Sequence, residues 1–294
     1  MQEFQIDSPS LTAFTMDPIF GRAANLVQTQ RKRREGARLL LEDVEFIDPY
    51  GLVSLWVIVR YLRRRFSRVR VILPQDRDLQ SYLRRMNFSV AIRGIARLEN
   101  DQHWKRVTGK PSDVLLEMTT IEKQADVVKV TRDILTRIGR ILRSELQYDD
   151  KDITAFSTVV AEVCTNVFDH SEDTGMVAAQ RYTKSDGTKY AIVAVADLGI
   201  GVRESLEKRY REAGQWSHLQ AIVNALRKEY SRRPERGLGL FMVSKIVGDY
   251  RGSLHIRSGD GRLYLRYRAR GISSAPFPGT QLSISLSSRA EEKS

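Results

Sequence analysis

The stretch "AEVCTNVFDHSED" (Ala161–Asp173) decides how the second half of the chain is interpreted. Its residues Glu162, Asn166 and His170 are four apart, so a helix places all three along one face. Asn offers a neutral oxygen of the kind that Mg²⁺ accepts. A Glu one turn earlier can take a proton from a hydroxyl or from water. A lone His in such a row is more often structural, so His170 is the least informative of the three.

A second motif is "VAVADLGIGV" (Val193–Val202), in which an apolar strand ends at Asp197 and is followed by Gly199 and Gly201. A carboxylate fixed at a strand end can accept a hydrogen bond from an exocyclic amine such as that of adenine. The two glycines let the backbone turn tightly and approach a planar ligand. Taken alone, Asp-x-Gly after a strand is also ordinary turn chemistry.

A third motif is "RGLGLFMVSKIV" (Arg236–Val247), where Gly237 and Gly239 precede an apolar helix. A glycine turn that leads into a helix gathers free backbone N–H groups at the positive end of the helix dipole, which suits phosphates. Close packing is the alternative explanation for the glycines. The spacing matches neither a Walker A loop nor a dinucleotide fingerprint.

In this order, the three motifs resemble the GHKL ATP-binding superfamily of gyrase, Hsp90-type chaperones, histidine kinases and MutL. The resemblance covers about Val114–Ser287 and includes "PGTQLSISL", where Gly279 and Thr280 precede the last strand. The first motif, with Glu followed by Thr-Asn and then His, is most similar to that of the anti-sigma-factor serine kinases. Sensor histidine kinases carry a phospho-accepting His on a long helix, and the expected helix from Glu122 to about Gln147 has none.

The resemblance implies an ATP and Mg²⁺ site in a two-layer α/β sandwich. It assigns Asp197 to the adenine amine, Asn166 to the Mg²⁺ and Glu162 to the role of general base. Thr280 is expected to support Asp197 through its hydroxyl, and residues 202–236 are expected to form an ATP lid. The other expected nucleotide contacts are Gly199 and Gly201 at the adenine and Gly237, Leu238, Gly239 and Leu240 at the phosphates.

The first third of the chain resembles another family. "LLLEDVEFIDPYGLVSLWVIVRYLRR" is similar to the STAS fold of anti-sigma-factor antagonists. The serine that is phosphorylated in that family corresponds to Tyr50 here, and its neighbouring serine to Pro49. A conventional phospho-switch is therefore not expected, although the hydroxyls of Tyr50 and Ser54 remain candidates.

The hydrophobic pattern predicts how the elements are arranged. Alternating strands and helices before residue 100 indicate parallel strands with helical crossovers. Polar residues 105–113 are expected to be a linker between domains at 1–110 and 111–294. The second domain is expected to be α+β, with helices on one face of a mixed sheet. The expected helices are 49–65, 77–88, 122–147 and 153–170, with Asp152 capping the last. The expected strands are 37–44, 69–74, 114–120, 175–183, 189–197, 253–259, 262–268 and 280–286.

Composition narrows the class of protein. The chain has 294 residues, a net charge of +12, one cysteine and no apolar run of about 20 residues that could span a bilayer. Residues 1–110 hold 20 Lys and Arg against 12 Asp and Glu, a net charge of +8. We expect a cytoplasmic protein, because a single cysteine and the lack of a signal-like start suit a reducing compartment.

Three functions are compatible with these observations. The leading one is an ATP·Mg²⁺-binding signalling protein, possessing Ser/Thr kinase activity on a protein partner and regulated by its own STAS-like domain. The second is an ATP-gated switch that changes conformation or forms a homodimer. The third adds nucleic-acid docking through the basic first domain; this is not favoured, because no aromatic residues are interleaved with the charges.

Overall fold

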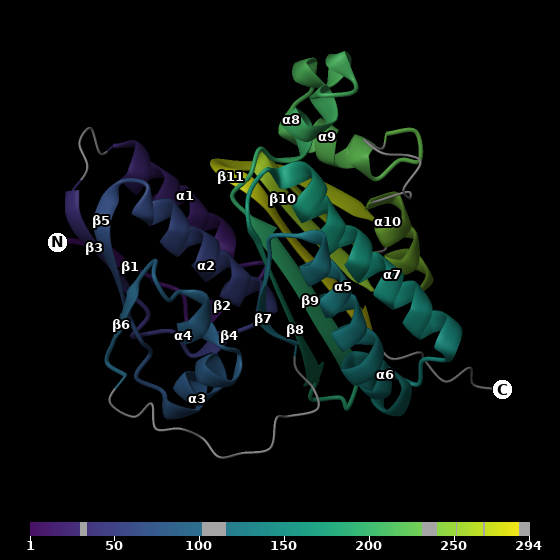
Figure 1. Cartoon of the computed structure of the whole chain (residues 1–294), viewed down its shortest axis with the longest axis horizontal. Helices are drawn as coiled ribbons and strands as arrows, with labels where there is room; N and C mark the ends of the chain where they lie inside the picture. The colour runs from purple at the N-terminus through teal and green to yellow at the C-terminus, as the bar shows by residue number, and fades with distance from the viewer. Residues whose placement is uncertain (30–33, 102–115, 231–239, 251, 267, 288–294) are drawn as a thin grey trace.

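The computed structural model describes residues 1–29, 34–101, 116–230, 240–250, 252–266 and 268–287. The expected linker at 105–113 lies outside these residues. The described chain forms two large sheets and one short two-stranded sheet, with helices between and beside the large ones (Figure 1). Their order in space is a parallel sheet, helices α1 and α2, an antiparallel sheet, and helices α5, α6 and α7.

The first sheet is parallel throughout, as the alternation of elements predicts. Its spatial order is β1 (Gln2–Gln5), β3 (Arg34–Leu40), β5 (Phe66–Ile72) and β6 (Arg97–Glu99). A short parallel pair stands beside it, formed by β2 (Ser10–Leu11) and β4 (Phe46–Ile47). The connecting helices are α1 (Met16–Gln28), α2 (Pro49–Arg63), α3 (Arg77–Arg85) and α4 (Phe88–Ala91).

Helix α2 is buried along nearly its whole length. Asp48 caps it by accepting a hydrogen bond from the Gly51 N–H at 2.8 Å, and Pro49 occupies the first turn as expected. All of its residues except Arg60 and Arg63 are buried. A helix that is apolar all round must be covered on all sides. Here β5 packs on one side, and strands of the second sheet pack on the other.

The second sheet is antiparallel between every pair of neighbours, so the expectation of a mixed sheet is wrong. The sequence shows periodicity but not strand direction, which the connections decide. The expected strands 253–259 and 262–268 form one strand that bends at register shifts beside Gly259. The spatial order is β10 (Ser253–Leu265), β11 (Ala269–Ser287), β9 (Lys189–Asp197), β8 (Gly175–Thr183) and β7 (Leu116–Ile121).

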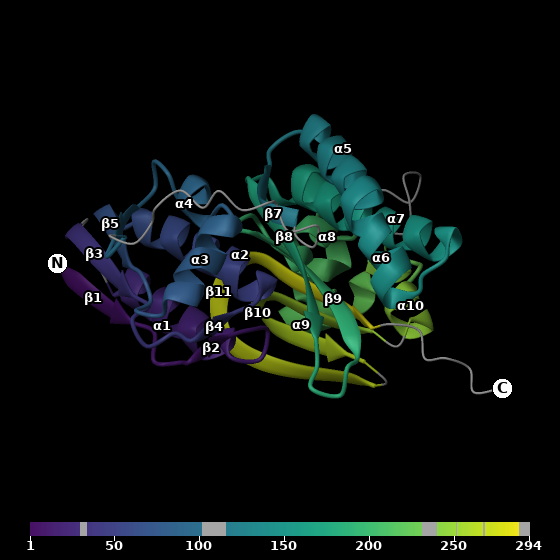
Figure 2. The ribbon, with the colours of Figure 1, turned by 90° about the horizontal axis from the view of Figure 1, so that it is seen from below.

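Helices cover one face of this sheet, and Figure 2 shows them on the side away from the N-terminal part. The helix expected at 122–147 is interrupted by a π-helical turn, η1 (Ile134–Ile138). The helix expected at 153–170 begins earlier, because Asp149 is its cap and Asp152 closes the capping box three residues on. The helices on this face are α5 (Gln124–Asp133), α6 (Gly139–Leu146), α7 (Asp150–Asn166) and α10 (Leu240–Asp249).

The other face of the antiparallel sheet is covered by α1 and α2. Side chains from both halves therefore share one apolar cluster, in which Met176, Ala194 and Phe277 of the sheet join the residues of the two helices. The Phe277 ring lies 4.6 Å from that of Phe20 and 4.8 Å from that of Tyr61. The two expected domains are thus joined by a buried apolar interface rather than by a linker alone.

A buried ion pair crosses the same interface. Arg257 of β10 is fully buried and donates to Asp17 of α1 over 3.1 Å, while its guanidinium lies 4.7 Å from the Phe20 ring. Tyr50 and Ser54 are both 0% exposed on α2, at this interface. The two hydroxyls therefore cannot accept a phosphoryl group in this conformation, which corrects the expectation that they are candidates.

Candidate nucleotide-binding site

Asp197 is the central polar group of the expected site. It ends β9, is 3% exposed, and its Oδ1 accepts hydrogen bonds from the Gly199 N–H at 2.8 Å and the Thr280 N–H at 3.3 Å. Burial raises the pKa of this carboxyl to about 7, against the opposing effect of these two hydrogen bonds. Both described donors bind Oδ1, so Oδ2 is the oxygen that a ligand can use.

Three chain segments close around Asp197 because glycines allow it. A side chain at Gly199 would collide with the Ser171 carbonyl oxygen, and one at Gly279, where φ is +80°, would collide with the Asp197 carbonyl oxygen. Gly201 has φ +84° and leads into α8 (Val202–Glu207). Gly199 is thus required for close packing of the strand end, which is the ordinary explanation of the motif and is compatible with a ligand site.

Thr280 supports Asp197 with its backbone and not with its hydroxyl, which corrects the expectation. The Thr280 hydroxyl lies 3.4 Å from Ser258 Oγ. Ser258 accepts from the Val202 N–H at 2.9 Å and donates to the Gly279 carbonyl at 3.1 Å, so it ties the expected lid to the last motif. The sequence gives no sign of this role, because a serine within a strand is unremarkable.

The polar row on α7 is confirmed as helical for Glu162 and Asn166. Both side chains are half-buried, and burial, together with the nearby Asp169 carboxylate, raises the pKa of Glu162. After Asn166 the chain forms a π-helical turn, η2 (Val167–Ser171), which changes the rotation per residue. His170 therefore does not continue the row at regular α-helical spacing, and its side chain lies outside the described residues.

The polar row on α7 and the Asp197 motif both fall within a range that matches a known family model. The range 122–267 matches the model of the histidine kinase-like ATPase domain. This range therefore resembles a GHKL-type ATPase domain, and it is called the ATPase domain below. Domains of this class bind ATP, usually with Mg²⁺. The comparison with curated proteins and that with solved structures found no match.

The matched range of the ATPase domain includes Glu162, Asn166 and Asp197 but stops before Gly279 and Thr280. The structure places β11 between β9 and β10, so this last strand completes the domain's sheet. The expected phosphate loop at 237–239 lies outside the described residues. Leu240 begins α10 and is half-buried against the core of the ATPase domain.

The expected lid of the ATPase domain is helical where it is described. It consists of α8, a 3₁₀ turn at Arg211–Gln215 and α9 (His218–Ala225), which begins with a capping box at Ser217. Residues 231–236 of the expected lid lie outside the described residues. Within the described ranges, no group of three or more His, Cys, Asp or Glu could hold a metal ion. The half-buried Asn166 amide therefore remains the candidate Mg²⁺ contact, a role that needs few protein ligands because phosphates and water supply the others.

The first half of the chain contacts the ATPase domain beside Asp197. Arg60 of α2 makes a bidentate ion pair with Asp173, at 2.8 and 3.0 Å. Asp173 in turn accepts from the Leu198 N–H at 3.2 Å, and Arg64 donates to the Leu198 carbonyl at 3.3 Å. These arginines belong to the basic run "RYLRRRFSRVR" (Arg60–Arg70), and in the sequence such a run indicates only a solvated face or a patch for an acidic partner, so these contacts could not be predicted.

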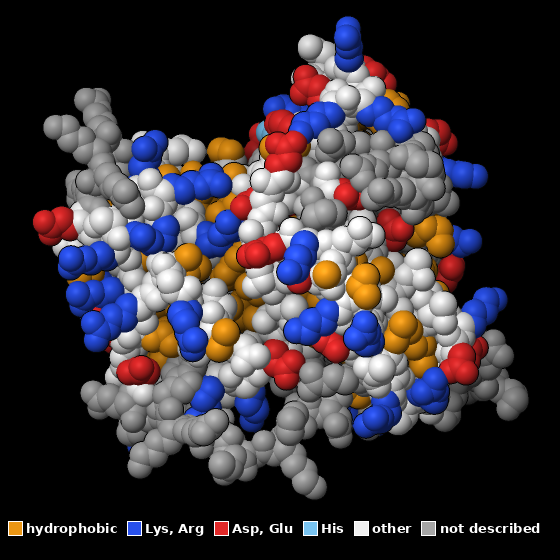
Figure 3. Space-filling model, in the orientation of Figure 1, with side chains coloured by type: hydrophobic (Ala, Val, Ile, Leu, Met, Phe, Trp, Pro, Cys, Tyr) orange, Lys and Arg blue, Asp and Glu red, His pale blue; other side chains and the backbone are white. Residues whose placement is uncertain are grey.

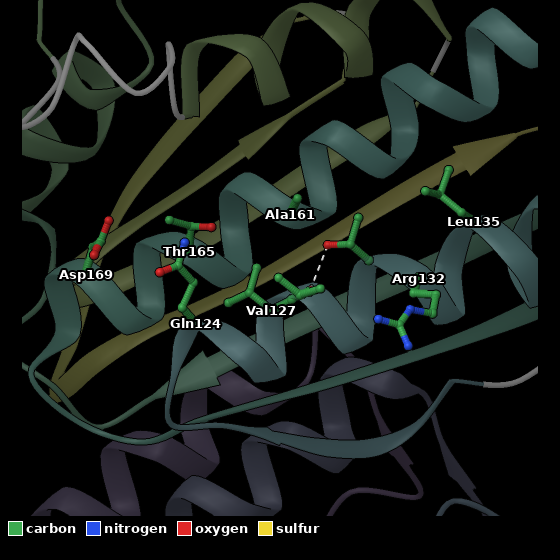
Figure 4. A pocket seen from close by; sticks show the side chains of 9 residues that line it. Gln124, Val127, Arg132, Leu135, Ala161, Thr165 and Asp169 are labelled. Atoms are coloured by element: carbon green, nitrogen blue, oxygen red, sulfur yellow. Dashed lines mark hydrogen bonds between the residues drawn. The ribbon is translucent and has the colours of Figure 1, made fainter.

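A separate groove of about 430 Å³ runs between α5 and α7 (Figure 4). Ala161 and Thr165 line it from α7, each one residue before Glu162 and Asn166, so the groove occupies a neighbouring face of the helix. Val128 of α5 and Leu135 of the π-helical turn η1 are exposed at it. Among the described residues, no helix is both long and apolar enough to cross a membrane.

Proposed function

We propose that this chain is an ATP·Mg²⁺-binding signalling protein in which Asp197 selects the adenine base. The observation that carries the proposal is the buried Asp197 carboxylate, with Oδ1 occupied by two backbone N–H groups inside a GHKL-type domain. Oδ2 accepts the exocyclic amine of adenine, and Gly199 and Gly201 form the adjacent wall. Asn166 binds the Mg²⁺ that neutralises the phosphates held at 237–240.

The test is the binding of a fluorescent ATP analogue to an Asp197→Asn variant. The backbone donors require an acceptor at Oδ1, so the amide nitrogen of the variant takes the place of Oδ2. It then faces the adenine amine, donor against donor. We expect the affinity for ATP to fall about tenfold to a hundredfold, the cost of one buried unsatisfied pair. Asp186→Asn, in the exposed turn between β8 and β9, is the control and keeps full affinity; equal affinities of the two variants would refute the adenine role.

The finer proposal is a Ser/Thr protein kinase of the anti-sigma-factor kind, acting on a protein partner. Glu162 supports it, because a half-buried carboxylate with a raised pKa is suited to take a proton from an acceptor hydroxyl near neutral pH. The STAS-like resemblance of residues 1–110 supports a built-in regulator or docking module. Incubation with γ-labelled ATP and a cell extract tests it: label on a second protein supports the kinase, and label released only as phosphate refutes it.

A second candidate function is an ATP-gated switch, which the Arg60–Asp173 ion pair favours. This contact links α2 to the backbone next to Asp197, so nucleotide binding at Asp197 and the position of α2 would influence each other. A switch would change its conformation or form a homodimer when ATP binds. Sedimentation with and without a non-hydrolysable ATP analogue tests the dimer: a mass that does not respond excludes nucleotide-driven dimerisation.

Nucleic-acid docking through the basic first domain is the least supported function. Figure 3 shows Lys and Arg side chains over the N-terminal part of the molecule. Arg60 and Arg64 of the basic run instead contact the ATPase domain, and Arg70 pairs with Glu99 at 2.6 Å. Binding that weakens steeply with salt would favour this function, and no binding at low salt would remove it.

A further inference from the structure

A hollow of about 220 Å³ lies between the N-terminal part and the face of the antiparallel sheet on which α1 and α2 pack. It is near the beginning of β9, whereas Asp197 ends that strand, so it is separate from the nucleotide site. The N-terminal part contributes its loop before α1, strand β4 and the cap of α2. The lining residues that matter most are Phe14, Phe46, Asp48, Ser253, His255 and Ser285.

The floor of the hollow is polar, which is unusual for the buried face of a sheet. Ser253 pairs with Ser285, and His255 with Ser283, across β10 and β11, so all four side chains share one face. Within the described chain, no hydrogen bond is made by the three serine hydroxyls. Both ring nitrogens of His255 are buried without a partner, although the side chain is only 5% exposed. Buried polar groups are almost always paired, so the His255 ring awaits a ligand or water, while the serine hydroxyls beside it are open to either.

The hollow is suited to an uncharged molecule. Burial lowers the pKa of His255 to about 3, so its ring is neutral and offers one donor and one acceptor. Burial raises the pKa of Asp48 to about 7, which makes its charge costly. No Lys or Arg lines the hollow, so an anion has no cationic partner among the lining residues, and the nearby Arg257 is already paired with Asp17.

Two phenylalanine rings line the hollow. Phe14 is 68% exposed and Phe46 is 42% exposed, which is unusual for phenylalanine. The Phe14 ring lies 5.3 Å from that of Tyr264, in an edge-to-face arrangement. Rings of this kind can cover the C–H face of a small cyclic molecule while hydroxyls and an imidazole bind its polar groups.

We propose that this hollow binds an uncharged, polyhydroxylated molecule of about monosaccharide size, with the serines and His255 contacting its hydroxyls. The ligand bridges the N-terminal part and the ATPase domain, because Asp48 and Phe14 come from one and His255 and Ser285 from the other. Bound there, it stabilises the pairing of the two halves by the free energy of its binding.

The test is calorimetric titration of the full chain with D-glucose, D-ribose and myo-inositol, each also used in thermal unfolding. We expect at least one of them to saturate and to raise the unfolding temperature. Ser285→Val and His255→Phe should weaken this binding at least tenfold while leaving ATP binding unchanged. Ser287→Val, two residues along the same strand and outside the lining, is the matched control and should bind as the parent chain does.

Three results would overturn the proposal. One is the absence of saturable binding by all three polyols, which would mean that water alone fills the hollow. Another is binding of inorganic phosphate, choline or adenine only, which would assign a different class of ligand. The third is polyol binding that Ser285→Val leaves intact. If His255→Phe does not fold, Ser285→Val and the exposed Phe14→Ala decide the question.

Discussion

Asp197 is a residue whose ionisation should control which purine it accepts. Its pKa of about 7 means that it is mostly a carboxylate above neutrality and mostly protonated below. The carboxylate accepts from the adenine amine, whereas a proton on Oδ2 would face that amine and would suit the carbonyl oxygen of hypoxanthine. We expect the ratio of ATP to ITP affinity to rise as pH rises from about 6 to about 8. The phosphates of ATP and ITP titrate alike, so their effect cancels in this ratio. An affinity ratio that stays constant with pH in competition binding would contradict the prediction.

Replacing Glu162 should affect catalysis without affecting nucleotide binding. Glu162 is half-buried on α7 and is not one of the residues expected to contact adenine. Glu162→Gln should therefore leave ATP affinity within about threefold. Removing a general base should lower turnover or phosphoryl transfer about a hundredfold or more. Thr158→Ala, one turn earlier on the exposed side of α7, is the control for damage to the helix. Turnover by Glu162→Gln equal to that of the control would show that Glu162 is not the base.

Helix α2 is the element through which the two halves contact each other beside the nucleotide site. Arg60→Leu leaves the half-buried Asp173 carboxylate without its bidentate partner. We expect the free energy of unfolding to fall by about 1–3 kcal/mol, the typical effect of losing hydrogen bonds to a charged group. ATP affinity should fall as well, because the unpaired Asp173 charge lies near Asp197 and disfavours its carboxylate form. Denaturant unfolding and nucleotide titration measure the two effects.

Arg65→Leu is the matched control for Arg60→Leu. Arg65 is exposed within the same basic run, and replacing it should change stability by less than about 0.5 kcal/mol. Equal effects of the two substitutions would mean that net charge, and not the ion pair with Asp173, is what matters.

The elements that the sequence predicted well are those with a clear local period. Strands β8 and β9 and the beginning of α2 lie where the pattern and the proline placed them. The π-helical turns, the antiparallel pairing and the bend in β10 depend on contacts between distant segments, so periodicity could not show them. Asp197 and Asn166 lie in local motifs, so the sequence indicated them as candidates. Ser258, Asp173 and Arg60 act through contacts between distant segments, so the sequence did not indicate them.

The whole molecule should unfold as one unit, because its two sheets share the apolar cluster around α1 and α2. A chain limited to residues 112–294 would expose Met176, Ala194 and Phe277, which α1 and α2 normally cover. We expect this fragment to bind a hydrophobic dye and to aggregate. The full chain should show a single calorimetric transition whose enthalpy equals the van't Hoff value.

Supplying residues 1–111 as a separate chain provides the control for that truncation. The interface between the halves rests on non-covalent contacts, namely the shared core and the Arg257–Asp17 and Arg60–Asp173 pairs. Co-expression should therefore restore a soluble complex that binds ATP. A fragment that is monomeric and binds ATP like the full chain would show that the ATPase domain needs no cover on this face. Two separate calorimetric unfolding transitions in the full chain would likewise show that the two halves fold independently.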